Sequence, residues 1–291
     1  MIPRSFEYFA PRALDEAVSL LLKLGPEAKI LSGGQSLIPM MKLRLASPQY
    51  ILDINGIPNL NYVFLVNGAV RIGALARESD LEFSPLIKSR FPLLADTTVV
   101  IADPLVRNQA TVCGNLAHGD PANDHPATML ALGASLLAVS NRGEREIPVE
   151  SFFTGLFETA LEPDEILKEI RVPIPPPSSG GAYLKMERKV GDYATAGVAV
   201  QITLDGAGVC QRAGIGLTNV GFTPLKAAKT EAFLAGKTLD DATIKQAAEF
   251  AAADSQPVDD IRGSADYKRD LVRVLTARAL NHALRRAKGG A

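Results

Sequence analysis

The sequence predicts an α+β protein built from two consecutive parts. Strand-like and helical patterns follow one another irregularly, without the regular strand-helix-strand repeat of a doubly wound sheet. A segment rich in proline and glycine, residues 173–181, separates a first part with hairpin signals from a second part that ends in long helical patterns. Because such a segment can neither continue a helix nor pair in a central sheet, we expect the main domain boundary there.

The first part begins with a helix and a strand. Apolar residues recur at helical spacing from Leu14 to Leu24, and Gly25-Pro26 ends the pattern. The apolar run Lys29-Ile30-Leu31 then predicts a short buried strand that leads directly into Ser32-Gly33-Gly34-Gln35-Ser36. The two glycines are therefore expected in a turn at the end of a strand.

Further strands and two hairpins are predicted in the first part. Residues 50–54 have the composition of a strand. Residues 62–74 indicate a hairpin that turns at Asn67-Gly68, the strongest short-range signal for such a turn. A second hairpin is expected to turn at Asn141-Arg142-Gly143.

The second part is predicted to change from strands to helices. Alternating apolar residues over 197–218 indicate strands on either side of Asp205-Gly206. A helix over residues 240–253 follows, with Thr238 as its expected N-cap, and Ser264 is expected to cap a longer helix that ends near Arg286.

Composition excludes several classes of function. The net charge of −1 and the pI of about 6.3 favour neither nucleic acid nor an anionic membrane surface. No apolar run approaches the roughly 20 residues that span a bilayer. The amino-terminal residues lack the apolar core of a secretory signal, so we expect a cytoplasmic protein without a membrane span.

The cysteine count argues against a metal cluster on this chain. Cys113 and Cys210 are the only cysteines, whereas a plant-type [2Fe-2S] cluster needs four thiolates and a structural zinc site needs four ligands. The three histidines share no metal-ligand spacing and do not supply the missing ligands. Both cysteines are expected to be free thiols.

Two clusters of small and polar residues are candidates for phosphate binding. In the turn at residues 32–36, glycines let backbone N–H groups converge on an anion, although an ordinary strand-exit turn is the commoner reading of such a pentapeptide. The cluster Thr111-Val112-Cys113-Gly114-Asn115 offers a second loop, followed closely by His118, Asp120 and Asp124. Two loops can hold one pyrophosphate from opposite sides. No G-x-G-x-x-G follows a strand, so a Rossmann site is not expected.

These residues resemble the FAD-binding medium subunits of molybdenum hydroxylases, the family typified by carbon monoxide dehydrogenase and related to the flavin domain of xanthine dehydrogenase. The likeness spans nearly the whole chain. Its motifs are Phe6-Glu7-Tyr8, Ser32 to Leu37 with Pro39-Met40-Met41-Lys42, Arg107-Asn108, Leu161 to Leu167, Tyr267-Lys268-Arg269 and Leu275 to Leu280.

The resemblance implies a fold and a cofactor. The fold is a PCMH-type FAD-binding domain over residues 1–176, with subdomains at about 1–55 and 56–176. A smaller α+β domain over residues 180–287, like the C-terminal domain of carbon monoxide dehydrogenase flavoproteins, follows. FAD would be bound non-covalently.

The resemblance also implies roles for individual residues. The pyrophosphate would be held by Ile30, Leu31, Ser32, Gly33, Gly34, Gln35, Ser36, Leu37, Thr111, Val112, Cys113, Gly114 and Asn115. Asp124 would accept hydrogen bonds from ribose or ribityl hydroxyls, and Ile101 would lie against the flavin. Leu167 and Lys185 would line the isoalloxazine site, and Tyr193 would cover one face of the ring. Catalytic residues are not expected.

Three of these residues also have plainer interpretations. Asp124 could cap a helix, Lys185 could be a solvated strand lysine, and Tyr193 could be a packing aromatic. Two positions depart from the family, which usually has alanine at Ser32 and glycine at Cys113. The Cys113 side chain must then point away from a phosphate, and FAD affinity could be reduced. Gly34→Val is expected to abolish FAD binding because its side chain would lie where phosphate approaches.

The implied function is electron transfer. A large subunit with the molybdenum cofactor would oxidise the substrate, and a small subunit with [2Fe-2S] clusters would relay electrons. FAD on this chain would pass them to an external acceptor, in a dimer of heterotrimers. A self-sufficient FAD-dependent oxidoreductase of the same fold and a nucleotide-binding module without redox turnover are the alternatives.

Overall fold

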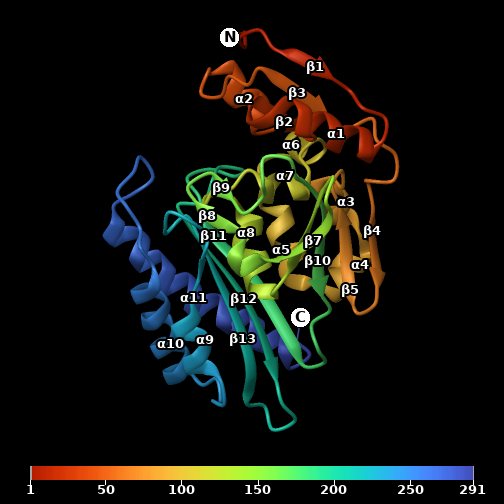
Figure 1. Ribbon diagram of the computed structural model, residues 1–291. Helices are drawn as coiled ribbons and strands as arrows, with labels where there is room; N and C mark the ends of the chain where they lie inside the picture. The colour runs from red at the N-terminus through yellow and green to blue at the C-terminus, as the bar shows by residue number, and fades with distance from the viewer. Residues whose placement is uncertain (1, 291) are drawn as a thin grey trace.

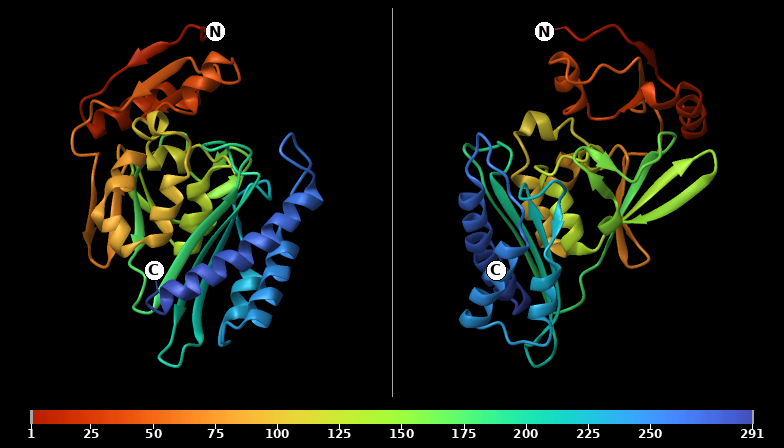
Figure 2. Two further views of the ribbon diagram at one scale, coloured as in Figure 1. Left: turned by 180° about the vertical axis from the view of Figure 1, so that it is seen from behind. Right: turned by 60° about the vertical axis from the view of Figure 1, so that its left-hand side comes forward.

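The computed structural model describes residues 2–290, which form three main sheets, each with its own hydrophobic core (Figure 1). Strands and helices are mixed without a regular repeat, so the predicted α+β class is confirmed. The first sheet forms a lobe at one end of the molecule, which both views of Figure 2 show beyond the rest of the chain.

The amino-terminal lobe is a small parallel sheet with one long helix. Strands β1 (Glu7–Phe9) and β2 (Ala28–Leu31) both pair in parallel with the central strand β3 (Tyr50–Asp53). Helix α1 (Leu14–Leu24) buries Ala17, Val18 and Leu21 against this sheet, and α2 (Leu37–Lys42) follows the turn after β2. The helix and the strands predicted here are confirmed.

The central part is an antiparallel sheet with the strand order β4-β5-β10-β6-β7. Its strands are β4 (Val63–Val66), β5 (Ala69–Gly73), β6 (Ser135–Ser140), β7 (Gly143–Pro148) and β10 (Ile166–Pro173). Asn67 and Gly68 both have positive φ, as the tight turn between β4 and β5 requires, and Ser140 pairs with Gly143 across the second turn. Both predicted hairpins are confirmed.

Short helices pack against the central sheet. They are α3 (Glu78–Phe83), α4 (Pro85–Arg90), α5 (Pro92–Val99), α6 (Pro104–Arg107), α7 (Val112–Ala117) and α8 (Asp124–Leu132). Leu94, Leu116 and Met129 from these helices, and Phe91 between α4 and α5, are buried with Ile72 of β5 in one core. A small hairpin, β8 (Phe153–Gly155) and β9 (Glu158–Thr159), lies between β7 and β10 in the sequence.

The carboxy-terminal part is a second antiparallel sheet with long helices. Its strands, in spatial order, are β11 (Ser179–Met186), β12 (Ala196–Leu204), β13 (Cys210–Thr218) and β14 (Leu225–Lys226). Helices α9 (Ala228–Leu234) and α11 (Ala265–Ala287) pack on this sheet, and α10 (Asp241–Asp254) packs against both of them. Helices α5 and α8 of the central part contact the other face of the sheet (Figures 1 and 2).

Glycines let the two larger parts approach closely. Gly180 and Gly181 are neighbours on β11, and a Cβ added to the first would meet α11 while a Cβ added to the second would meet Leu93 of α5. Gly214 and Gly216 on β13 both face α8, where an added Cβ would collide with the backbone carbonyls of Ala131 and Ala127. Helix α8 therefore lies with its backbone directly on the second sheet.

Two local predictions were wrong. Pro173 does pair, as the last residue of β10, because a strand end does not need its missing N–H, and residues 179–181 pair at the start of β11. The cap of α10 is Asp240 instead of Thr238, since the Asp240 carboxylate accepts from the N–H of Thr243. Ser264 caps α11 as predicted, accepting from the N–H of Tyr267.

No helix over residues 2–290 combines the length and the apolar content that a membrane crossing needs.

Replacing Gly216 by alanine tests the contact between α8 and β13. The new Cβ would collide with the Ala127 carbonyl, and we expect the free energy of unfolding to fall by about 1 to 3 kcal/mol, as for other overpacked sites. Urea unfolding measures this change. Gly206→Ala is the matched control, because an added Cβ at the β12–β13 turn meets nothing within 4 Å. Equal stability of the two variants would contradict the close contact.

Candidate functional site

A cavity of about 730 Å³ lies between the amino-terminal lobe, the central part and a loop of the carboxy-terminal part. This volume falls within the usual range for cofactor sites. The residues that were proposed from the sequence all line this cavity, with the exception of Val112 and Lys185. Val112 is fully buried in the central core, and Lys185 lies behind Asp124. Segments that are far apart in the sequence are thus brought together as predicted.

The turn after β2 presents unpaired backbone donors. Ser32 to Ser36 form a tight turn in which Gly34 has φ +74°, a value that favours glycine. Among residues 2–290, no acceptor pairs with the N–H groups of Gly33, Gly34, Gln35 or Ser36. Four consecutive N–H groups without a protein acceptor, on the wall of the cavity, are available to an anion.

The second cluster lies against the first. Thr111 caps α7, where its Oγ1 accepts from the N–H of Gly114 at 3.2 Å, and the same hydroxyl lies 2.9 Å from Oγ of Ser32. A Cβ added to Gly33 would lie 2.6 Å from the carbonyl oxygen of Gln109 and 2.8 Å from the nitrogen of Thr111. The two segments therefore form one continuous cradle.

The predicted second loop is in fact the first turn of a helix. Thr111 supplies the cap for α7, and Val112 and Leu116 bury its apolar side in the central core. Gly114 is needed here because an added Cβ would meet Oγ1 of Thr111 at 2.6 Å and Oγ of Ser32 at 3.2 Å.

Two side chains that the sequence analysis missed brace the cradle from outside. Asn55 donates from Nδ2 to the carbonyl oxygen of Ser32 at 2.7 Å. Arg77 donates from Nη2 to Oδ1 of Asn55 at 2.8 Å and from Nη1 to the carbonyl oxygen of Gln109. One chain of hydrogen bonds thus joins both segments. No sequence spacing connects Asn55 with Arg77, so only the fold could reveal the hydrogen bond between them.

The structure decides two questions raised at the cradle. The Cys113 thiol lies 3.7 Å from the carbonyl oxygen of Ile72, in the central core, and so points away from the cavity as expected. Burial raises the pKa of this thiol well above its usual value, and Cys210 is also buried and free. The Gly34→Val side chain was expected to lie where phosphate approaches. This expectation was wrong, because an added Cβ would meet the side chains of Ile38 and Leu31.

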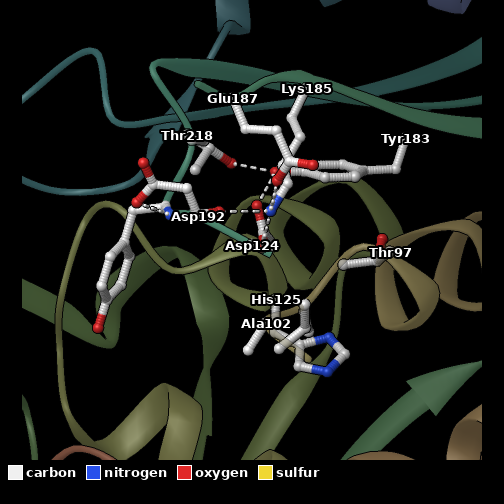
Figure 3. Close-up of polar contacts among 12 residues, drawn as sticks. Thr97, Ala102, Asp124, His125, Tyr183, Lys185, Glu187, Asp192 and Thr218 are labelled. Atoms are coloured by element: carbon white, nitrogen blue, oxygen red, sulfur yellow. Dashed lines mark hydrogen bonds and ion pairs between the residues drawn. The ribbon is translucent and has the colours of Figure 1, made fainter. Parts of the chain in front are cut away.

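Asp124 is held by two side chains of β11 (Figure 3). Tyr183 donates from Oη to Oδ1 of Asp124 at 2.6 Å, and Lys185 donates from Nζ to Oδ2 at 3.1 Å. Lys185 also donates to the carbonyl oxygen of Asp192 at 3.1 Å and lies 3.2 Å from the Glu187 carboxylate. This network joins the central part to the carboxy-terminal part.

The plainer interpretations of Asp124 and Lys185 were therefore wrong. Asn123 occupies the N-cap position of α8, and the Asp124 carboxylate is engaged elsewhere. The Lys185 side chain is only 3% exposed. Burial raises the pKa of Asp124 above its ordinary value, although the charge of Lys185 and the hydrogen bond from Tyr183 oppose this shift.

The loop around Tyr193 closes one side of the cavity. Tyr193 is 43% exposed, and the Arg262 guanidinium lies 5.6 Å from the centre of its ring. Gly191 packs on the backbone of Ala102, where an added Cβ would lie 2.8 Å from the carbonyl oxygen. Ile101, on the wall beside Ala102, is buried. Tyr193 thus lines the cavity and keeps an exposed face.

Other wall residues were not predicted. His118 and Phe157 line the cavity with their ring centroids 5.2 Å apart, and Phe157 has positive φ, which is unusual for a bulky residue. Glu158 and Thr159 come from the same small hairpin. Over residues 2–290, no three His, Cys, Asp or Glu side chains are grouped to hold a metal ion.

Comparison with families of known proteins accounts for most of the chain. Residues 4–175 match the FAD binding domain in molybdopterin dehydrogenase, and residues 181–283 match the carbon monoxide dehydrogenase flavoprotein C-terminal domain.

Individual relatives match this chain over nearly the full length of both proteins. The chain is 45% identical over 283 residues to the carbon monoxide dehydrogenase medium chain of Hydrogenophaga pseudoflava, covering 97% of this chain and 98% of that one. It is 37% identical over 288 residues to subunit alpha of the 6-hydroxypseudooxynicotine dehydrogenase complex of Paenarthrobacter nicotinovorans, covering 99% and 97%.

A solved structure shares the fold. It is that of carbon monoxide dehydrogenase from Hydrogenophaga pseudoflava lacking the Mo-pyranopterin moiety of the molybdenum cofactor. The TM-score is 0.96 at 46% identity, covering 98% of this chain and 99% of that chain.

Gly33→Ala tests whether the two segments act as one cradle. The added methyl group would press on the backbone of Gln109 to Thr111 and separate the segments, so we expect the affinity for FAD to fall at least about tenfold, or about 1.4 kcal/mol. Titration of the flavin-free protein, followed by flavin fluorescence, measures the affinity. Gly206→Ala, in open space, is the control. Unchanged affinity in Gly33→Ala would contradict a single cradle.

Proposed function

Because the chain belongs to the family of FAD-binding medium subunits of molybdenum hydroxylases, we propose that it carries electrons from the [2Fe-2S] clusters of a partner subunit to an external acceptor. It is the FAD-containing component of an oxidoreductase. In the proposed assembly, a small iron-sulfur subunit and a large molybdenum-binding subunit complete a heterotrimer, which pairs into a dimer of heterotrimers in the cytoplasm.

The cradle is the observation that carries this proposal. Four consecutive free N–H groups, with the hydroxyls of Ser32 and Thr111 beside them, fit the anionic oxygens of a diphosphate without a Rossmann motif. Gly33 and Gly114 let the two segments pack closely, since an added Cβ at Gly33 would meet the backbone of Gln109 to Thr111 and one at Gly114 would meet the hydroxyls of Thr111 and Ser32. The cavity continues from this cradle to Asp124 and Tyr193, so it can hold an extended dinucleotide.

We propose the following roles for the wall residues. Residues 30–37 and 111–115 hold the pyrophosphate. Asp124 accepts hydrogen bonds from hydroxyls of the ribose or ribityl chain, since each of its oxygens keeps a lone pair beyond the bonds to Tyr183 and Lys185. Ile101, Leu167 and Tyr193 surround the flavin ring with apolar surface.

Lys185 receives a different role from the one first expected. Its ammonium group contacts the carboxylates of Asp124 and Glu187 and the carbonyl oxygen of Asp192. Its side chain does not line the cavity. We propose that Lys185 acts on the cofactor through Asp124, by keeping that buried carboxylate charged and oriented.

When bound, FAD supplies redox chemistry that can receive electrons singly and release them in pairs. The residues of this chain bind it, orient it and limit the access of water. They include no proposed general acid, base or nucleophile. The substrate that is hydroxylated would be chosen by the molybdenum-binding subunit, and relatives named for carbon monoxide and for 6-hydroxypseudooxynicotine agree with a flavin subunit that serves different substrates.

We also propose the domain limits 1–176 and 180–287, the first divided at about residue 55. Three hydrophobic cores, centred on the three sheets, support this division, although the core of the first sheet also takes in Val139 and Ile166 and that of the central sheet also takes in Tyr183. The likeness to medium chains over nearly the full length of both proteins favours the subunit over a self-sufficient oxidoreductase or a module without redox turnover.

Reduction of the flavin tests the electron-transfer role. The purified chain, loaded with FAD, should show flavin absorption that organic substrates alone do not bleach. Addition of the reduced iron-sulfur partner should bleach it, and an acceptor should restore it. Stopped-flow spectroscopy follows each step. Direct reduction by a small organic substrate would instead support the self-sufficient oxidoreductase, and a chain that takes up no FAD would contradict the proposal altogether.

A further inference from the structure

Tyr183 connects the two larger parts of the molecule at the candidate site. It lies on β11, is 4% exposed, and sends its hydroxyl to Asp124 at the start of α8 (Figure 3). The same hydroxyl lies 3.1 Å from Oγ1 of Thr218 on β13. Gly197 on β12 makes room for it, since an added Cβ would lie 2.5 Å from Oη. Three strands therefore shape the position of one hydroxyl.

We propose that Tyr183 is a positioning residue for FAD binding, which fixes the carboxylate of Asp124 in the orientation and the ionised form that accept a hydroxyl of the cofactor. This inference rests on the proposed function. Tyr183 does not line the cavity and would not touch the cofactor, so its effect must pass through Asp124.

Lys185 alone does not orient Asp124, because the two oxygens of the carboxylate have different donors. Lys185 reaches only Oδ2 of Asp124, and its ammonium group also contacts the carbonyl oxygen of Asp192 and the carboxylate of Glu187. Oδ1 receives its protein hydrogen bond from Tyr183. Because the Tyr183 hydroxyl donates to Asp124, it is left to accept from Thr218. The sequence of donors from Thr218 through Tyr183 to Asp124 gives the carboxylate one defined rotamer.

Several charged or titratable groups face Asp124. Tyr183 and Lys185 approach from β11, with Glu187 beside Lys185, and His125 follows on α8. The loop after β11 contributes Asp192 and Tyr193. His125 itself is paired with Glu78 of α3 at 2.6 Å. These neighbours are common to the wild type and to a Tyr183→Phe variant, so a difference between the two reports on the Tyr183 hydroxyl.

The direction of the pH effect follows from these contacts. Burial raises the pKa of Asp124, and the hydrogen bond from Tyr183 opposes that rise, so removal of the hydroxyl raises the pKa further. Ionised Asp124 is the form that accepts the cofactor hydroxyl. FAD affinity should therefore be lost as the pH falls through the Asp124 pKa, and in Tyr183→Phe this loss should begin at higher pH.

The experiment is a titration of the flavin-free chain with FAD over a range of pH. Tyr183→Phe retains the buried ring, and we expect its affinity at neutral pH to fall about tenfold, as for the loss of one hydrogen bond to a charged group. The acid limb of the affinity profile, that is, the fall in FAD affinity at low pH, should move to higher pH. Thr218→Val should change both quantities in the same direction but less. Asp124→Asn should bind weakly and show no acid limb.

Tyr62→Phe is the matched control. The Tyr62 hydroxyl also donates to a carboxylate, Glu169, at 2.8 Å, but these residues do not line the cavity. Its affinity and pH profile should equal those of the wild type. Melting temperatures establish that every variant is folded.

Three results would overturn the inference. They are a wild-type profile in folded Tyr183→Phe, an affinity loss in that variant without movement of the acid limb, and an acid limb that persists in Asp124→Asn. In each of these cases the wild-type chain still binds FAD and the proposed function stands. A wild-type chain that binds no FAD would reject the proposed function itself.

Discussion

The direct contact between α8 and β13 is the constraint on which the site depends. Gly214 and Gly216 place no side chain between the sheet and the helix, so the carbonyls of Ala127 and Ala131 lie against the strand. Asp124 is the first residue of this helix, and the contact fixes its distance from Tyr183 on the same sheet. A larger residue at Gly214 or Gly216 would lift α8 and separate the two.

Buried charge is tolerated here because several partners share it. Transferring a carboxylate and an ammonium group out of water costs several kcal/mol for each, so an isolated pair of Asp124 and Lys185 would be a poor source of stability. Tyr183, Thr218 and the Asp192 carbonyl complete the hydrogen bonding of this pair. The arrangement is therefore better understood as a device for orienting Asp124 than as a contribution to folding.

Local patterns in the sequence predicted the local structure well. The helical spacing over 14–24, the turn at Asn67-Gly68 and the cap at Ser264 each depend on a few neighbouring residues, and all three are present. Resemblance to a family selected wall residues of a single cavity. Tyr183 and the Asn55–Arg77 brace escaped prediction because their partners are set by packing between distant segments.

The brace around the cradle bears on how much the backbone must move when the cofactor binds. Asn55, Arg77 and Gln109 bond to one another and to Ser32 through groups of this chain alone, so the protein itself holds the four free N–H groups in line. A binding site that is ordered in this way loses little conformational entropy on binding, and that saving favours affinity.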